Sequence, residues 1–176
     1  MADLSVRPAL PEDAHAIAVI HAANFAALLK LGSGEEVIMD PESFETQWLD
    51  AIEDPPSAKH RILVALEDTR VVGFAAIAPV EEPIPDADGD EGPPAEILAL
   101  EVAREDRRKG HASRLLAACA DILRQTGADS VQIWCVSGDK PREGFLESAG
   151  FGQRGVRRGY EIGTGTITEN AWYAVL

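Results

Sequence analysis

Hydrophobic and polar residues follow strand and helix periods in the first half of the chain. Alternation predicts a strand over residues 4–7, and two apolar runs joined by the turn Asp68-Thr69 predict a hairpin of strands over residues 61–67 and 70–80. Apolar residues at helical spacing predict one helix through residues 17–31. A second helix is predicted to begin at Asp40-Pro41-Glu42 and to end before Pro55-Pro56.

The second half continues the succession of strands and helices. It predicts a strand, a helix, a strand, a short helix and a closing antiparallel pair, over residues 97–102, 113–126, 130–136, 138–149, 151–162 and 167–176, with the last turn at Gly163-Thr164-Gly165. The resulting order, βααβββαβαββ, has no internal repeat and no linker. It predicts an α/β fold in one domain over residues 1–176.

One segment, residues 81–95, lacks the apolar residues that a core needs. It holds six acidic residues, four prolines and no basic residue, so we expect a mobile surface loop. Asp86, Asp88 and Asp90 are spaced in a way that suggests metal ligands. The glycine and the downstream glutamate of a calcium loop are missing from their places, so no metal site is predicted.

The charge narrows the range of partners. With 30 acidic and 16 basic residues the net charge is −14, and repulsion makes nucleic acids and anionic membranes poor partners. The longest mostly apolar run, residues 71–80, is too short to span a bilayer, and Met1-Ala2-Asp3 does not begin a signal peptide. Cys119 and Cys135 fall on a helix face and in a strand, which indicates two buried thiols in a reducing cytoplasm.

The strongest chemical signal lies where the strand at residues 97–102 passes through a basic turn into a helix. The first N–H groups of a helix have no partner inside it and sit at the positive end of its dipole, so a phosphate fits there. Gly110 lets the backbone approach a ligand closely, and Ala112 adds little bulk. The alternative is a solvated basic turn that only caps the helix.

The same turn carries a resemblance. Arg107-Arg108-Lys109-Gly110-His111-Ala112 fits the pattern Arg/Gln-x-x-Gly-x-Gly/Ala, with an apolar strand before it, a Leu-Leu helix after it and Gly150-Phe151 about 40 residues on. On these features the chain resembles the GCN5-related N-acetyltransferase (GNAT) superfamily over nearly its whole length. The resemblance implies a mixed central sheet with helices on both faces. It also implies that the strands at residues 97–102 and 131–136 splay apart around the pantetheine arm of an acyl-CoA.

The resemblance further implies acetyl-CoA as co-substrate, a primary amine as acceptor and a possible homodimer. In that scheme three strand residues pair with the pantetheine amides, the loop binds the pyrophosphate mainly through N–H groups, and Asp139 stands where many members have Asn. The cofactor-binding residues expected on this basis are Leu100, Glu101, Val102, Arg107, Arg108, Lys109, Gly110, His111, Ala112, Ser113 and Asp139. Asp139 also suits the N-cap of the helix that contains Pro141. His111 is expected to point to solvent or to lie near CoA.

Glu96 is the candidate general base, because it stands 14 positions before Gly110, the register of the base in histone-acetylating members. The alternative is an exposed glutamate at a strand end. Simple alternation puts Glu101 on the opposite face of the strand from Glu96. The family also binds its acceptor near the segments that correspond to His21, Asn24 and residues 32–39, and near the turn at residues 163–166.

The chain departs from the family at the group that protonates the leaving thiolate. Many members have a Tyr four residues before the Gly of Gly-Phe, and here that position holds Leu146. Either another group donates a proton or the thiolate leaves stabilised by the electrostatics of the site. The candidate substitutes are Tyr160, Tyr173, Ser137 and Cys135.

Two function classes follow from this sequence. The first is an acetyl-CoA-dependent N-acetyltransferase that acts on a small molecule, an amino acid or a protein. The second is a non-catalytic or regulatory acyl-CoA-binding module of the same fold, which the missing Tyr makes conceivable. A nucleotide hydrolase is disfavoured, because the loop lacks the Gly-Lys-Ser/Thr ending of a phosphate-binding P-loop.

Overall fold

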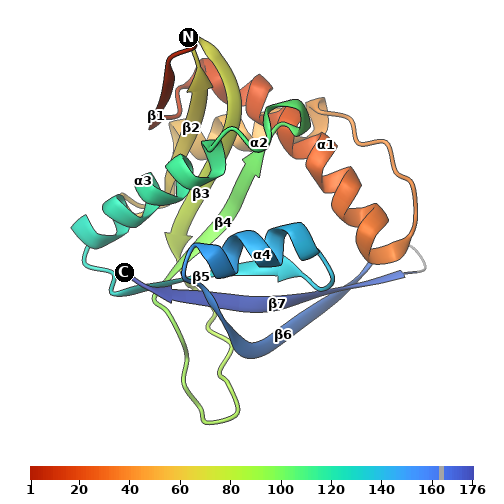
Figure 1. Ribbon diagram of the computed structural model, residues 1–176, viewed down its shortest axis with the longest axis vertical. Coiled ribbons are helices and arrows are strands. Elements are labelled where there is room, and N and C mark those ends of the chain that lie inside the picture. Colours follow the sequence, from red (N-terminus) through yellow and green to blue (C-terminus); the bar gives the residue numbers. More distant parts are fainter. Residues whose placement is uncertain (163–164) are drawn as a thin grey trace.

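The computed structural model of the protein describes residues 1–162 and 165–176, and it contains one seven-stranded sheet (Figure 1). The strands lie in the order β1-β2-β3-β4-β5-β7-β6, and every neighbouring pair is antiparallel except β4 and β5. The strands are β1 (Leu4–Pro8), β2 (Arg61–Glu67), β3 (Arg70–Pro79), β4 (Ala95–Val102), β5 (Ser130–Val136), β6 (Gly152–Ile162) and β7 (Gly165–Val175). The turn predicted at Gly163-Thr164-Gly165 lies partly outside the described residues.

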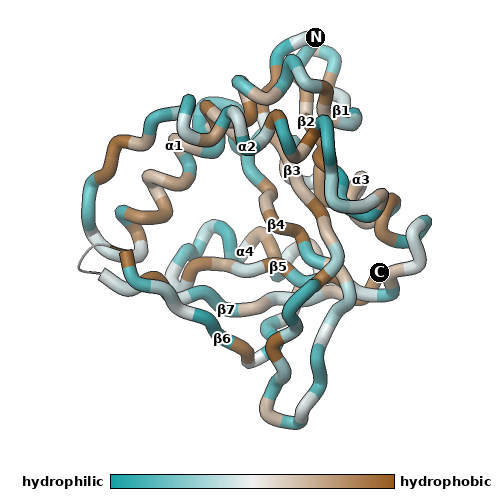
Figure 2. Tube along the Cα trace, turned by 180° about the vertical axis from the view of Figure 1, so that it is seen from behind, coloured by the Kyte–Doolittle hydropathy of each residue, from teal (hydrophilic) through white to brown (hydrophobic). Residues whose placement is uncertain are grey.

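Four α-helices cover the two faces of the sheet: α1 (Ala14–Ser33), α2 (Glu42–Glu53), α3 (His111–Gln125) and α4 (Lys140–Ser148). Apolar residues of α3 and α4, among them Leu115 and Leu146, share one core with the sheet. Ile17 and Ile20 of α1 form a second core on the other face, against which α2 packs. Figure 2 shows the apolar residues that run along β3 and β4 between these layers. The predicted fold class and element order are therefore confirmed.

Most element boundaries fall within two or three residues of the predicted ones. β4 and β7 each begin two residues before the predicted start, and two helix ends also differ. α1 continues through Gly32 and Ser33, because the Ser33 hydroxyl donates to the Leu29 carbonyl and the left-handed turn is taken by Gly34 at φ 77°. α3 begins at His111, two residues before the predicted start. Its N-cap is Gly110, also left-handed, at φ 85°.

A β-bulge in β4 sets the register of the central strands. Ala76 of β3 pairs with Ala99, whereas the next residue, Ile77, pairs with Ile97, so Leu98 has no counterpart in β3. An extra residue of this kind reverses the inward and outward alternation of the strand beyond it.

The bulge overturns the predicted placement of two carboxylates. Ala95 and Ile97 before the bulge, and Leu100 after it, all join the core under α3 and α4. Glu96 and Glu101 therefore share the other face of the sheet, and the prediction that they lie on opposite faces is wrong. Alternation alone could not show this, because the bulge depends on how β4 pairs with β3.

The acidic loop between β3 and β4 has a more definite structure than the sequence predicts. One carboxylate oxygen of Asp86 accepts the backbone N–H groups of Asp88 and Asp90, at 2.9 and 3.0 Å, which holds the tip of the loop in a turn. Arg154 of β6 donates to the carbonyls of Ile84 and Asp90, at 3.0 and 2.9 Å. These bonds attach the loop to the lower end of the sheet, near the start of β4 (Figure 1).

The two cysteines lie in the interior of the fold, and the first long helix packs on the sheet. Cys119 and Cys135 are free and buried, and burial raises the pKa of each thiol to about 12. By length and composition, the segment Pro11–Ser33 is a candidate membrane span. It is longer than the apolar run at residues 71–80. In this fold it is the helix whose Ile17 and Leu29 are buried on the sheet.

Candidate functional site

A wedge opens in the middle of the sheet, between β4 and β5. The two strands pair only at their first residues, with Ala95 opposite Val131 and Ile97 opposite Ile133. Beyond Ile97 they diverge, while β4 stays paired with β3 as far as Val102. The edge of β4 that faces β5 is thus open, and the predicted splaying of these strands is confirmed.

The loop at the far end of β4 presents a row of backbone donors. The N–H groups of residues 108–110 donate to no acceptor among the described residues, and no side chain caps α3. The first residues of a helix, here 111–113, also lack intrahelical acceptors. Arg108 at φ 66° and Gly110 at φ 85° turn the backbone so that it curves around this point. Consecutive N–H groups of this kind, at the positive end of a helix, make an anion site.

Two cationic side chains of the loop are held by neighbouring residues. Arg107 donates to the Oδ1 atom of Asn24 at 2.9 Å, and Asn24, which is buried on α1, donates to the Glu101 carboxylate at 2.8 Å. Lys109 pairs with Asp106 at 2.9 Å. All four of these cationic residues, Arg107, Arg108, Lys109 and Arg114, are exposed. The loop can therefore offer its backbone to an anion, with these exposed arginines beside it.

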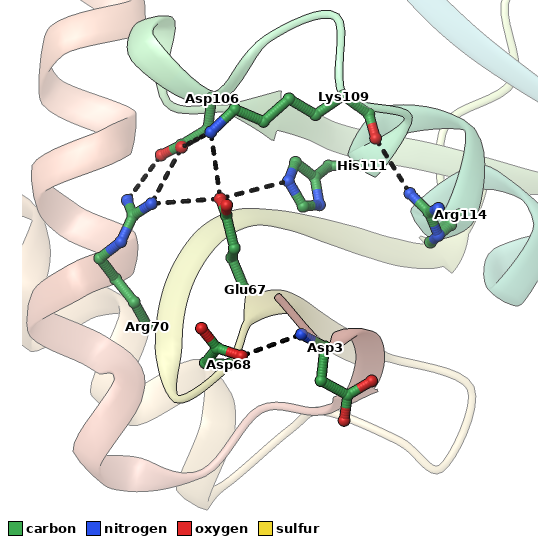
Figure 3. Close-up of polar contacts among 8 residues, drawn as sticks. All are labelled: Asp3, Glu67, Asp68, Arg70, Asp106, Lys109, His111 and Arg114. Carbon is green, nitrogen blue, oxygen red and sulfur yellow. Dashed lines mark hydrogen bonds and ion pairs between the residues drawn. The ribbon is translucent and has the colours of Figure 1, made fainter. Parts of the chain in front are cut away.

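His111 is buried at the start of α3. The residue is 2% exposed, so the first of its two predicted placements, toward solvent, is wrong. Neither ring nitrogen has a hydrogen-bond partner among the described residues, and Nε2 lies 3.9 Å from Oε2 of Glu67 (Figure 3). Burial lowers the pKa of the imidazole. Any contact between His111 and a bound anion must therefore come from its backbone.

Asp106 lies in the turn before α3 and is contacted by Arg70 and Lys109, as Figure 3 shows. Its carboxylate is almost fully buried and receives two bonds from Arg70, at 2.6 and 2.9 Å, and one from Lys109 at 2.9 Å. The hydrogen bond from Arg70 is the main reason that the pKa of Asp106 lies far below its usual range, against the opposing effect of burial. The ionised carboxylate joins β3 to the loop and fixes the approach to α3.

We predict that Asp106→Asn lowers the free energy of unfolding at pH 7 by about 2 kcal/mol, because two cations lose a nearly buried counter-charge. Below about pH 4 the unfolded chain takes up a proton that the folded Asp106 does not, so this contribution disappears from the wild type as the pH falls. Urea unfolding at pH 7 and pH 3 measures both effects. Asp121→Asn, on the exposed Asp121–Arg124 pair, is the matched control. Equal stabilities of wild type and Asp106→Asn at pH 7 would contradict the prediction.

Glu96 lies at the closed end of the wedge, half-buried. The Nε2 atom of Gln132 and the Nε1 atom of Trp134 both donate to its Oε1 atom, at 2.8 and 2.7 Å. The second oxygen, Oε2, has no partner among the described residues. One oxygen is thus fixed in position, and the other is free to take a proton. Sequence reasoning identified Glu96 but missed both donors, which come from a different strand.

The surface beside Glu96 combines aromatic and charged groups. The Arg158 guanidinium lies over the Trp134 ring, 4.2 Å from its centroid, and pairs with Glu169 at 2.6 Å. Tyr173 lies opposite Gln132 across the β5–β7 ladder, so its side chain leaves the same face. His21 and Asn24 of α1 do not extend this surface, because His21 accepts a bond from Trp48 inside an aromatic cluster. Asn24, as described above, supports Arg107.

Helix α4 borders the wedge, where its Arg142 side chain contacts β4. Three residues of this segment bear on the site. The Asp139 carboxylate accepts the Arg142 N–H at 3.2 Å, which confirms the predicted N-cap. Leu146 is fully buried in the core. Arg142 reaches across the wedge and donates to the Leu100 carbonyl at 2.5 Å. Sequence reasoning missed Arg142, because nothing in its local context shows that it faces β4.

A polar pocket of about 480 Å³ lies between α4 and the β6–β7 pair. Its lining comes from the α4 residues Lys140 and Glu143, and from Gln153, Arg157 and Asn170 of the β6–β7 pair. None of these residues belongs to β4 or to the loop at residues 107–113, here called the anion loop.

Comparison with known families agrees with this geometry. A family model described as Acetyltransferase (GNAT) family matches residues 25–151, which include the wedge, the anion loop and α4. The chain belongs to the GNAT family. No match was found among curated proteins.

Solved structures show the same fold along the whole chain of this GNAT protein. A ribosomal-protein-alanine N-acetyltransferase from Brucella melitensis has a TM-score of 0.70 and 22% identity, covering 98% of this chain and 99% of that one. The putative acetyltransferase YncA from Salmonella typhimurium, solved with its cofactor acetyl-CoA, has a TM-score of 0.68 and 16% identity, covering 98% and 93%. PaiA N-acetyltransferase from Thermoplasma acidophilum, in complex with coenzyme A, has a TM-score of 0.68 and 14% identity, covering 99% of each chain. At these identities the likeness concerns the fold.

Proposed function

We propose that this GNAT protein transfers an acetyl group from acetyl-CoA to a primary amine. The observation that carries the proposal is the uncapped start of α3, which lies at the end of the strand whose edge is open along the wedge. A ligand with a pyrophosphate at one end and an extended amide chain at the other matches both features. Two fold neighbours that hold acetyl-CoA or coenzyme A support this choice of co-substrate.

In this proposal the pyrophosphate binds the N–H groups of residues 108–113, and the pantetheine arm runs along residues 100–102 of β4. The carbonyls of Leu100 and Val102 already accept side-chain donors, Arg142 on the first and Asn24 on the second. The arm would then meet the free backbone groups of the strand and the Arg142 guanidinium. The Asp139 carboxylate serves α4 as its N-cap, so its proposed part in cofactor binding comes through the position of that helix.

Glu96 is the proposed general base. An attacking amine must lose a proton to form an amide, and the free Oε2 atom of Glu96 faces the side of the sheet opposite α3 and α4. The donors Gln132 and Trp134 hold the carboxylate in one orientation while its proton-accepting oxygen stays available. The acceptor approaches from that face, directly or through a water, and attacks the thioester carbon across the wedge.

Calorimetric titration with acetyl-CoA, CoA and ATP tests the co-substrate directly. We expect micromolar binding of both CoA species and none of ATP, followed by release of free thiol when a panel of amines is added. Absence of CoA binding would refute the assignment of the loop. Binding without turnover of any amine would favour the second hypothesis, a non-catalytic acyl-CoA-binding module.

We also propose a cellular location, an oligomeric state and a class of acceptor for this protein. The two buried free thiols support a reducing, cytoplasmic location. A homodimer is proposed on the family resemblance, and sedimentation of the purified chain tests it. The acceptor is proposed to be an amine of a small molecule, an amino acid or a protein.

A further inference from the structure

Arg142 occupies an unusual place in the wedge. It lies one turn before Leu146 on α4, and the two side chains share a helix face. Leu146 is buried in the core under that face, so Arg142 is the next side chain that reaches β4. Its Nη1 atom donates to the Leu100 carbonyl at 2.5 Å, which places the guanidinium beside the open edge of β4.

The charge of Arg142 is not neutralised by a neighbour. No carboxylate among the described residues forms an ion pair with it, and its side chain is half-buried. Only one of the five N–H donors of a guanidinium is used on Leu100. A half-buried cation without a counter-ion stabilises any negative charge that forms next to it, because little water is present to screen the interaction.

We propose that the Arg142 guanidinium stabilises the sulfur of coenzyme A as it leaves as a thiolate. This inference rests on the proposed function, since it needs an acyl-CoA in the wedge. The amine nitrogen bonds to the acetyl carbon, the carbon–sulfur bond breaks, and its electron pair goes to sulfur. The proton of the amine goes to Glu96 and then to solvent, so the thiolate carries the charge until solvent protonates it.

Other groups near the wedge are less suited to this role. Burial raises the pKa of the Cys135 thiol to about 12, and the thiol lies in the core. Asp139 is negative and would repel a thiolate. The side chain of Tyr173 projects from the same face of the sheet as Gln132, whereas α4 packs on the opposite face. Arg142 is thus a side chain of α4 that both contacts β4 and carries a positive charge.

The test is the pKa of the CoA thiol when CoA is bound, followed by the ultraviolet absorbance of the thiolate as the pH is raised. In the wild type we expect a value at least about one unit below that of CoA free in the same buffer. Arg142→Gln should return it to the value of free CoA and lower kcat about 100-fold, with the Kd of acetyl-CoA changed by less than about threefold. The buried protein thiols do not interfere, because their pKa values of about 12 lie above this range.

Two variants complete the experiment. Arg142→Lys keeps the charge and should preserve most of the lowered thiol pKa, whereas Arg124→Gln, on an exposed arginine of α3, should change neither the pKa nor kcat. An unchanged thiol pKa in Arg142→Gln would overturn the proposal, as would an equal loss of affinity for CoA and acetyl-CoA without a change in kcat. If wild-type protein binds no CoA, the proposed function itself fails.

Discussion

Gly110→Glu is expected to reduce the affinity for acetyl-CoA by at least about 100-fold, the larger part of it from charge repulsion. A side chain at this position is strained, because the backbone is left-handed at φ 85°. The new Cβ atom would lie 2.9 Å from Nη1 of Arg114, and the carboxylate would stand against the row of N–H donors of residues 108–113. Calorimetry with acetyl-CoA measures the effect.

Gly127→Glu provides the matched control for that experiment. Gly127 has the same φ of 85° but follows the other end of α3, and a Cβ atom there has no neighbour within 4 Å. The backbone strain is therefore similar, while the charge lies far from the loop. Equal affinities of Gly110→Glu and Gly127→Glu for acetyl-CoA would show that the anion site has been misplaced.

Glu96→Gln is expected to lower kcat by about 100-fold while the Kd of acetyl-CoA stays within about threefold of the wild type. The amide is nearly isosteric, and its oxygen can still accept the bonds from Gln132 and Trp134. What it loses is the ability to take a proton from the amine. The rise of kcat/KM with pH that reports the general base should therefore vanish in this variant.

Glu101→Gln tests the competing assignment that the bulge in β4 creates. Glu101 shares the face of Glu96, but its carboxylate already accepts a bond from Asn24 at 2.8 Å. We expect this variant to keep the pH dependence of the wild type. Loss of the pH-dependent rise in Glu101→Gln, with Glu96→Gln unaffected, would transfer the role of base from Glu96 to Glu101.

The candidate site was partly visible in the sequence, and the parts that were visible are local. The loop motif at residues 107–112 consists of consecutive residues. The anion site could therefore be predicted without knowledge of the fold. Glu96 was proposed through the family resemblance, because its distance from Gly110 matches the register of the base in histone-acetylating members. The N-cap role of Asp139 follows from the residues just after it, and the structure confirms it.

The residues that sequence reasoning missed all act over long separations. Gln132 and Trp134 hold Glu96 from β5, and Arg142 reaches β4 from α4. Arg154 of β6 donates to two carbonyls of the acidic loop, more than 60 residues before it in the sequence. Contacts between residues this far apart depend on strand order and register, and no local periodicity encodes these.

By itself the sequence determined the succession of helices and strands, because the period of apolar residues reports which face of each element must be buried. It also predicted the helix start after Gly110 as a phosphate site, and the structure leaves that helix start without a side-chain cap. Only the tertiary structure decided which carboxylates share a face and which cation enters the wedge. One unpaired residue, Leu98, reverses the alternation of β4, and its lack of a partner is a property of two strands together.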